Sequence, residues 1–354
     1  MQIGISTFVE TTPDSRGRII SHAERIRQIV GEVELADRVG LDVYGIGEHH
    51  RPDFAVSQPT ELLAACAVNT KRIRLSSAVT VLNTADPVRV YQGFATVDAL
   101  SNGRAEIMVG RGSFVESYPL FGYNLADYDT LREEKLDLLL AINENNREVH
   151  WRGKFRPELT GQGVYPDPVQ ERIPVWVGTG GNAESVIRAA SLGLPVVFAI
   201  IGGNPLGFAP FVELYERSIG QFGTQASIKA RFGQHYIASH SHGFVAETDD
   251  LAREKYFHST QTVMAQLARE RNWPPYTRDT YEAACDPDGA LFVGSPQTVA
   301  DKIIKMRKAV GLRRFFMHLP LGTMDDHGDV LNAIELLGSK VKPMVDVALK
   351  DYHG

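Results

Sequence analysis

The stretch VYGIGEHH, from Val43 to His50, runs from an apolar segment typical of a buried strand directly into an acid and two adjacent histidines. Neighbouring side chains of a strand point to opposite faces, so Glu48, His49 and His50 cannot all be core residues or all be solvated. We therefore expect at least one of them to face a cleft at the end of this strand.

Apolar strand-like segments alternate with helical patterns along the whole chain. Strands are expected at residues 3–7, 43–47, 74–81, 106–110, 174–178, 195–201, 231–238 and 313–319. Helices are expected at residues 21–39, 59–69, 87–100, 131–143, 183–191, 211–219, 249–271 and 330–345, with Ser21 as an N-cap. Eight such units favour an α/β fold, a closed (β/α)8 TIM barrel with insertions in the loops, over an open doubly wound sheet. We expect residues 1–354 to form a single domain of this kind.

Four long irregular segments interrupt the alternation, at residues 112–128, 144–172, 240–248 and 273–291. Loops of this length usually have a function. The first and third follow the fourth and seventh predicted strands, which places them on the C-terminal face of a barrel, where active sites are built. We interpret these two segments as candidate lids.

Composition restricts the classes of partner and compartment. The net charge is -6 and the basic residues are scattered, so the basic surface expected of a nucleic-acid-binding protein is missing. The two cysteines, Cys66 and Cys285, cannot form a disulfide framework or a thiolate metal site by themselves, which favours a reducing compartment. No apolar run approaches the ~20 residues that span a bilayer, and the start MQIGISTFVE does not resemble a signal peptide. We expect a cytoplasmic protein that acts on a small molecule.

A glycine-rich turn follows the fifth predicted strand, in VWVGTGGNAESV from Val175 to Val186. Backbone N–H groups at a helix N-terminus bind anions, and glycines let a phosphate approach closely. Thr179, Gly180 and Gly181 are therefore candidates for a phosphate cradle, although a tight turn with a glycine at positive φ explains them equally well. Arg111, at the end of the fourth predicted strand, could supply a fixed cation to the same phosphate. The stretch is neither a dinucleotide-binding GxGxxG nor a P-loop.

Five stretches together resemble the bacterial luciferase-like flavin monooxygenases, along nearly the whole chain. They are EHH (48–50), VLNTADPVR (81–89), LSNGRAEIMVGRG (100–112), YPDPVQERIPVWVGTGG (165–181) and GSPQTVADKI (294–303). The resemblance implies a barrel that binds reduced FMN at the C-terminal ends of its strands, with the phosphate at the turn after strand five. It also implies an enzyme that activates O2 on the flavin, oxidises a small organic substrate and takes reduced FMN from a separate flavin reductase. We further expect a homo-oligomer.

The resemblance assigns roles to individual residues. His49 matches the histidine that supports the flavin peroxide, and His50 matches its neighbour beside the cofactor; an imidazole poised near neutral pH suits a proton relay. Members of this family have a non-proline cis peptide under the flavin ring, and its position aligns with Ala78–Val79 of this chain. The predicted catalytic residue is thus His49, and the predicted cofactor-binding residues are His50, Ala78, Val79, Arg111, Thr179, Gly180 and Gly181. Gly110 stands where luciferases proper carry a reactive cysteine, so light emission is not implied.

Three alternatives stay open at this point. Related barrels bind flavin without evident turnover, and others use a deazaflavin, although EHH favours FMN. The third alternative is a metal-dependent barrel hydrolase, in which adjacent histidines and the HSH stretch from His240 to His242 would bind the ion. The remaining carboxylate and histidine spacings form no convincing ligand set, so we expect no metal.

Overall fold

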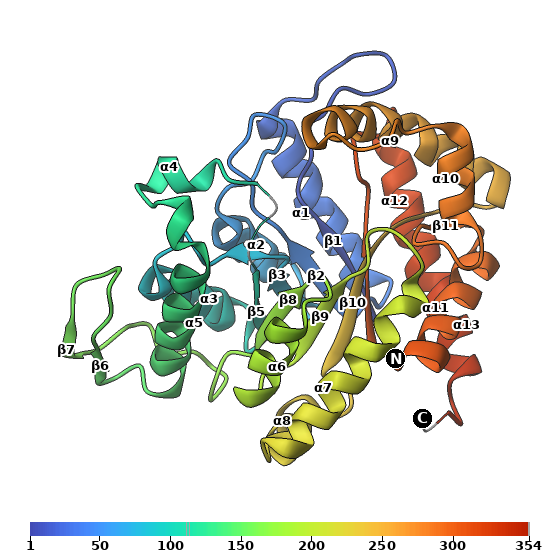
Figure 1. Cartoon of the computed structure of the whole chain (residues 1–354). Helices are drawn as coiled ribbons and strands as arrows, with labels where there is room; N and C mark the ends of the chain where they lie inside the picture. Colours follow the sequence, from blue (N-terminus) through green and yellow to red (C-terminus); the bar gives the residue numbers. More distant parts are fainter. Residues whose placement is uncertain (111, 113, 353–354) are drawn as a thin grey trace.

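A closed ring of eight parallel strands forms the centre of the computed structural model, which describes residues 1–110, 112 and 114–352 (Figure 1). Each strand pairs in parallel with the next, and the last returns to the first. The order around the ring is β1 (Gln2–Thr7), β2 (Val43–Ile46), β3 (Arg74–Ser77), β5 (Ala105–Gly110), β8 (Val175–Thr179), β9 (Val196–Ala199), β10 (Ile237–Val245) and β12 (Arg314–His318). The predicted (β/α)8 barrel is confirmed.

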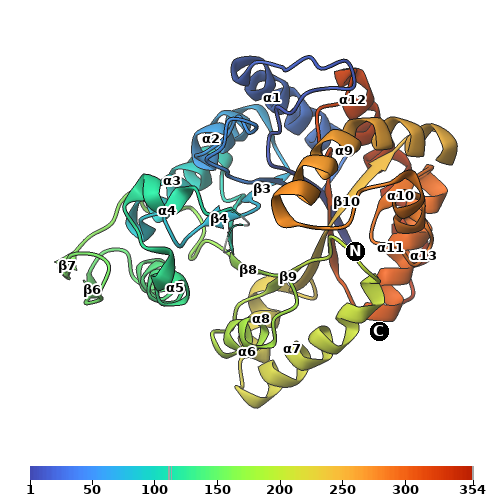
Figure 2. The same cartoon turned by 45° about the horizontal axis from the view of Figure 1, so that its top comes forward.

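Helices surround the strands on the outside, as the view in Figure 2 shows. Ser21 caps the first of them by accepting a hydrogen bond from the Glu24 backbone N–H at 3.2 Å, as the sequence predicts. The main helices are α1 (His22–Arg38), α2 (Pro59–Asn69), α3 (Pro87–Ser101), α5 (Tyr128–Glu144), α6 (Ala183–Ser191), α7 (Ala209–Gln221), α9 (Asp249–Arg271), α11 (Pro296–Val310), α12 (His327–Leu336) and α13 (Lys342–Ala348). Among the described residues, no helix combines the length and apolar composition that crossing a membrane requires.

The N-terminal end of the barrel is closed by a buried ion-pair network. Glu106 of β5 lies 2.6 Å from the Arg314 guanidinium of β12, across the interior, and also pairs with Arg74 of β3. Burial would raise the Glu106 pKa, but the two arginines outweigh it and hold that pKa below its usual value. The Arg314 guanidinium also lies 4.3 Å from the ring centre of Trp176. These side chains fill the barrel interior at the N-terminal end of the strands.

The long segments between the units carry elements of their own. Residues 112–128 contain α4 (Ser117–Phe121) and a short 3-10 helix, η1 (Leu125–Asp127). Residues 144–172 contain an antiparallel hairpin of β6 (Val149–Trp151) and β7 (Leu159–Gln162). The later insertions and connections are η2 (Pro205–Phe208), α8 (Gln225–Phe232), α10 (Arg278–Cys285), β11 (Phe292–Gly294) and the π-helical η3 (Leu337–Val341). The third strand is also interrupted, because β3 ends at Ser77 and a two-residue strand, β4 (Thr80–Val81), follows.

The seventh predicted strand, residues 231–238, is wrong in its placement. Arg231 and Phe232 end helix α8, Gly233 follows with a φ of 57°, and the strand β10 covers residues 237–245. His240 and His242 therefore lie inside a strand, and residues 240–245 are not part of a lid. All nine positions of β10 are buried, its serines and histidines included. The sequence thus lacks the apolar and polar alternation that marks a half-exposed strand.

Candidate active site

A buried glutamate–histidine pair lies where β1 and β12 end. His318 is the last residue of β12 and Glu10 follows β1, and the His318 Nε2 atom lies 2.8 Å from Glu10 Oε1. Glu10 also accepts a hydrogen bond from the Thr7 hydroxyl at 3.1 Å. Burial alone would raise the Glu10 pKa, but the attraction and hydrogen bond of His318 outweigh it and lower that pKa. Glu10 is therefore an ionised carboxylate at neutral pH.

Two further histidines from β10 pack against this pair. The rings of His240 and His242 have their centres 5.2 and 5.0 Å from the ring centre of His318. Burial lowers the pKa of His240 to about 3 and that of His242 well below its usual value, so both imidazoles are neutral. Within the described part of the chain, His240 Nε2 and His242 Nδ1 have no hydrogen-bond partner. These two buried nitrogens therefore have unsatisfied hydrogen-bonding capacity within the described residues.

His49 is held in a cage of three aromatic rings. Its ring centre lies 4.7 Å from that of Phe8, 4.5 Å from that of Phe54 and 4.8 Å from that of Phe114. Burial lowers the His49 pKa to about 3, and its Nε2 atom has no partner among the described residues. The expectation of an imidazole poised near neutral pH is therefore wrong, because burial keeps this ring neutral. His49 is a neutral ring that can donate or accept one hydrogen bond.

His50 has different surroundings from His49, and both residues follow β2, which ends at Ile46. Its Nε2 atom lies 3.7 Å from Glu48 Oε1, and its ring packs 5.1 Å from that of Phe121. Glu48, His50 and Thr80 line a cavity of about 780 Å³ beside α2 and α3. Burial raises the Glu48 pKa. The structure therefore separates the three residues of EHH onto two sides of the strand end.

The predicted cis peptide at Ala78–Val79 is confirmed. It lies between strands whose glycines leave no room for a side chain. A Cβ atom added to Gly45 would lie 2.7 Å from Ala78 Cβ, and one added to Gly110 would lie 2.6 Å from Val79 Cγ2. The glycines of β2 and β5 therefore let this segment lie close to both neighbouring strands.

Thr179, Gly180 and Gly181 lie where β8 leads into α6. Asn182 caps α6 by accepting a hydrogen bond from the Ser185 N–H at 2.9 Å. Gly181 has a φ of 88°, which favours glycine, so the tight-turn explanation holds for this residue. A Cβ at Gly180 would meet nothing within 4 Å. Gly180 therefore faces open space at the start of a helix, where an anion could bind.

Arg132 of α5 is a cation near this turn that the sequence did not reveal. Its Nη1 atom lies 3.3 Å from the hydroxyl of Ser185, in the first turn of α6. In the sequence Arg132 stands in the charged stretch LREEK of an amphipathic helix, where it looks like an ordinary surface residue. The predicted phosphate-binding cation, Arg111, lies outside the described residues.

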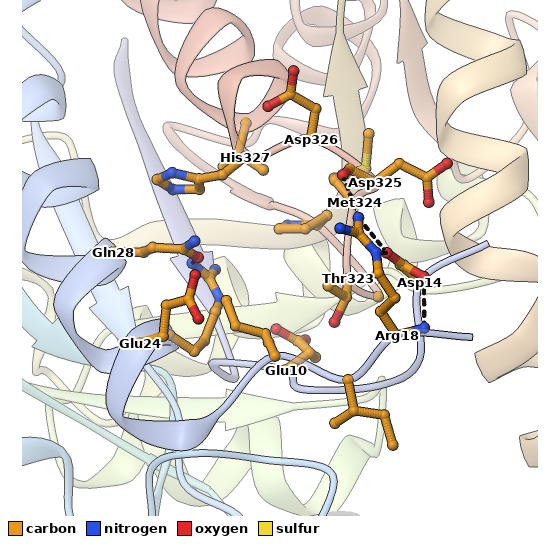
Figure 3. A pocket seen from close by; sticks show the side chains of 16 residues that line it. Glu10, Asp14, Arg18, Glu24, Gln28, Thr323, Met324, Asp325, Asp326 and His327 are labelled. Carbon is orange, nitrogen blue, oxygen red and sulfur yellow. Dashed lines mark hydrogen bonds and ion pairs between the residues drawn. The ribbon is translucent and has the colours of Figure 1, made fainter. Parts of the chain in front are cut away.

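Glu10 borders two cavities of opposite character. The first, the mouth cavity, has a volume of about 490 Å³, lies between the aromatic cage and α9, and is also lined by His242. The second, of about 360 Å³, is polar (Figure 3). Figure 3 shows Glu10 pointing into it, with an ion pair of 2.7 Å between Arg18 and Asp14 at one side. The mouth cavity is the one that could hold an apolar substrate.

A metal centre is the alternative interpretation of these histidines. Across residues 1–110, 112 and 114–352, no group of three or more His, Cys, Asp and Glu side chains is arranged to hold a metal ion. His240, His242 and His318 lie close together without forming such a set.

Comparison with known proteins places the chain in a family. Residues 1–313 match the family model described as luciferase-like monooxygenase. The chain is 34% identical to an uncharacterized protein, y4vJ, of Sinorhizobium fredii, over 94% of this chain and 95% of that protein. This chain belongs to the luciferase-like monooxygenase family, and it is by class an oxygen-using oxidoreductase.

Two solved structures share its fold. The first is the FMN complex of the oxygenating constituent of 3,6-diketocamphane monooxygenase from Pseudomonas putida. Its TM-score is 0.77 at 18% identity, over 98% of both chains. The second is an F420-dependent secondary alcohol dehydrogenase, with a TM-score of 0.72 at 16% identity, over 97% of this chain and 98% of that one. At these identities the likeness concerns the fold alone.

Proposed function

We propose that this protein binds reduced FMN at the C-terminal end of the barrel and uses it with O2 to oxidise a small organic substrate. The observation that carries the proposal is the turn between β8 and α6. It combines free space at Gly180, a capped helix N-terminus and the nearby guanidinium of Arg132. Backbone N–H groups and a cation in this arrangement suit a phosphate monoester such as that of FMN.

The residues around the proposed ring site fit a planar cofactor with polar edges. His49 Nε2, His50 Nε2 and Thr80 Oγ1 are buried and have no hydrogen-bond partner among the described residues. Such groups cost free energy unless a ligand or water completes their hydrogen bonds. Bound reduced FMN would supply the electrons that activate O2. The neutral His49 would donate or accept a hydrogen bond beside it, and its aromatic cage would exclude water.

The decisive experiment compares cofactors. We expect FMN to bind at least about tenfold more tightly than riboflavin, because each phosphate contact to a charged or backbone donor contributes about 1.5–3 kcal/mol. Equal affinities in a fluorescence titration would contradict the phosphate site. Rapid mixing of the reduced FMN complex with O2, followed by measurement of oxidised substrate and hydrogen peroxide, then distinguishes an oxygenase from a protein that only stores flavin.

A deazaflavin cofactor is the second candidate, because the F420-dependent dehydrogenase has the same fold. Parallel titrations with F420 and FMN distinguish the two candidates. If F420 binds more tightly than FMN, the cofactor is the deazaflavin. We further propose that a separate reductase supplies the reduced cofactor, and that the protein works in the cytoplasm as a homo-oligomer.

A further inference from the structure

Arg51 directly follows the EHH stretch and gathers three carboxylates around one guanidinium. Its Nε atom lies 3.1 Å from Asp53 Oδ1, in the same loop. Its Nη1 atom lies 3.2 Å from Oε1 of Glu116, the N-cap of α4. Its Nη1 and Nη2 atoms also lie 3.3 and 3.2 Å from the two carboxylate oxygens of Glu270, near the end of α9. Arg51 thus joins residues 65 and 219 positions away in the chain, whose helices Figure 1 shows on different sides of the barrel.

The contact with Glu270 has the geometry in which an arginine binds a carboxylate most specifically. Two N–H groups of the guanidinium face the two oxygens of one carboxylate, and a lysine cannot reproduce this fork. Glu270 itself is fixed by Gln266, one turn earlier on α9, whose Nε2 atom donates to it at 2.8 Å. The Arg51 side chain is only 15% exposed, so water screens these contacts less than those of an ordinary surface ion pair.

The same guanidinium contacts one wall of the aromatic cage around His49. It lies 4.5 Å from the ring centre of Phe114, a distance at which a cation is attracted to an aromatic ring. The Phe114 ring centre in turn lies 4.8 Å from that of His49. Phe114 precedes Glu116 by two positions, so two contacts of Arg51 act on the same short segment. Arg51 therefore holds the cage wall that comes from the long insertion after β5.

Removal of the Arg51 charge would leave these carboxylates facing one another. Glu116 and Glu270 both contact the Nη1 atom of Arg51, so without it two negative charges would lie close together and repel each other. The segment that carries Phe114 would then separate from α9. Arg51, Phe114 and Gln266 all line the mouth cavity, so this separation would admit water to the cavity beside His49.

We propose that Arg51 is a positioning residue for His49: it fixes Phe114 against the imidazole by joining residues 114–116 to the end of α9. Side chains that act on a reaction need neighbours that hold their geometry, and this guanidinium supplies such support from outside the cage. The effect on oxidation rests on the proposed function, because it acts through His49. The positioning itself can be measured in the protein without flavin.

Amide hydrogen exchange of the full-length, flavin-free protein tests the inference with Arg51→Met, which keeps an apolar stem and removes the charge. We expect residues 114–128 and 262–271 to exchange at least about tenfold faster than in the wild type, because both lose the group that joins them, while helix α7 stays unchanged. Arg172→Met is the matched control, because Arg172 pairs with Glu144 and does not line the mouth cavity. Unchanged exchange of residues 114–128 in Arg51→Met would overturn the inference.

The NMR signal of the His49 ring distinguishes positioning from a general loss of stability. Three aromatic rings surround this imidazole and shift the signal of its Cε1–H group, which is identified by its loss in His49→Gln. We expect the signal to move toward that of an exposed histidine in Arg51→Met and to stay in place in Arg172→Met. Arg51→Lys keeps the charge without the fork, so its signal should lie between those of the wild type and Arg51→Met. A His49 signal that Arg51→Met leaves unchanged would overturn the positioning role.

Glu270→Gln tests the same link from α9 and serves if Arg51→Met does not fold. It removes one charge of the fork, so residues 114–128 should exchange at least about threefold faster, although Glu270 lies on α9. Faster exchange confined to residues 262–271 would overturn the link through Arg51. Titration of the same samples with FMN keeps the two proposals apart. Failure of the wild type to bind FMN would contradict the proposed function and leave the exchange and NMR results valid.

Discussion

His318 and Glu10 are 308 positions apart in the chain, yet their side chains meet at 2.8 Å inside the protein. The contact exists because the barrel closes between β1 and β12, whose residues Ser6 and His318 pair in register. Glu10 is 3% exposed and His318 is fully buried. The closure of the fold thus creates the charged centre of the candidate active site.

This pair should make folding sensitive to acid. The Glu10 pKa is lowered in the folded protein, so its contribution to stability is complete above its usual pKa of 4.5 and is lost as the pH falls through the lowered value. We expect Glu10→Gln to reduce the free energy of unfolding at pH 7 by about 3 kcal/mol, and the difference from the wild type to narrow below pH 4.5. Urea unfolding at several pH values measures both. Glu213→Gln is the control, because Glu213 is exposed on α7. If the stability difference between the wild type and Glu10→Gln does not change with pH, Glu10 does not have a lowered pKa in the folded protein.

The two glycines of the β8–α6 turn should respond differently to alanine. A Cβ at Gly181 would lie 3.1 Å from Phe211 at a φ of 88°, so Gly181→Ala should destabilise the protein by about 1 kcal/mol or more. A Cβ at Gly180 meets open space, so Gly180→Ala should leave the melting temperature unchanged. It should lower the affinity for FMN, because the added methyl group would crowd the phosphate. Melting curves and FMN titrations of both variants check this. Full FMN affinity in a stable Gly180→Ala variant would place the phosphate elsewhere.

Arg132 should contribute to the preference for FMN over riboflavin. Removal of one charged hydrogen-bonding group from a phosphate costs about 1.5–3 kcal/mol, so Arg132→Ala should lower FMN affinity at least about tenfold and leave riboflavin affinity unchanged. Arg147→Ala, which removes an exposed arginine paired with Asp167, is the control. If Arg132→Ala lowers the affinities for FMN and riboflavin equally, the substitution acts by disturbing the fold and not by removing a contact to the phosphate.

His49 and His50 should have separable effects. His49 lies in the aromatic cage and His50 beside Glu48. We expect His49→Ala to retain FMN binding but to lower the yield of oxidised substrate about hundredfold or more, with hydrogen peroxide released instead. His50→Ala should weaken FMN binding more. Product and peroxide are measured per O2 consumed, and unchanged yields in His49→Ala would show that this histidine only packs the strand end.

Chelation should leave the protein unaffected. No described group of residues is arranged as a metal site, so dialysis against EDTA should change neither the melting temperature nor FMN binding. Elemental analysis of the purified protein provides an independent check. About one zinc, manganese or iron per chain, lost on replacement of His240 and His242, would favour the hydrolase alternative.

Local sequence determined the order of the barrel units and part of the site. Strand and helix signals are short-range, so patterns such as VYGIGEHH and the capped start at Ser21 predicted their elements correctly. The prediction of a strand over RFGQHYIA was wrong because helix α8 ends at Phe232 and strand β10 begins only at Ile237, after a turn at Gly233. The resemblance to a family supplied the cis peptide at Ala78–Val79, which no local pattern announces.

Only the tertiary structure decided which polar residues share a site and in what state. Barrel closure brings Glu10 to His318 and places His240 and His242 against them, because the ends of neighbouring parallel strands meet at one rim. Burial then keeps His49 and His240 neutral, with pKa values of about 3 that no sequence pattern encodes. Arg132 reaches the β8–α6 turn because α5 and α6 follow the neighbouring strands β5 and β8. The sequence specifies which residue stands at each position. The contacts between these residues and their burial arise only when distant segments of the chain pack together.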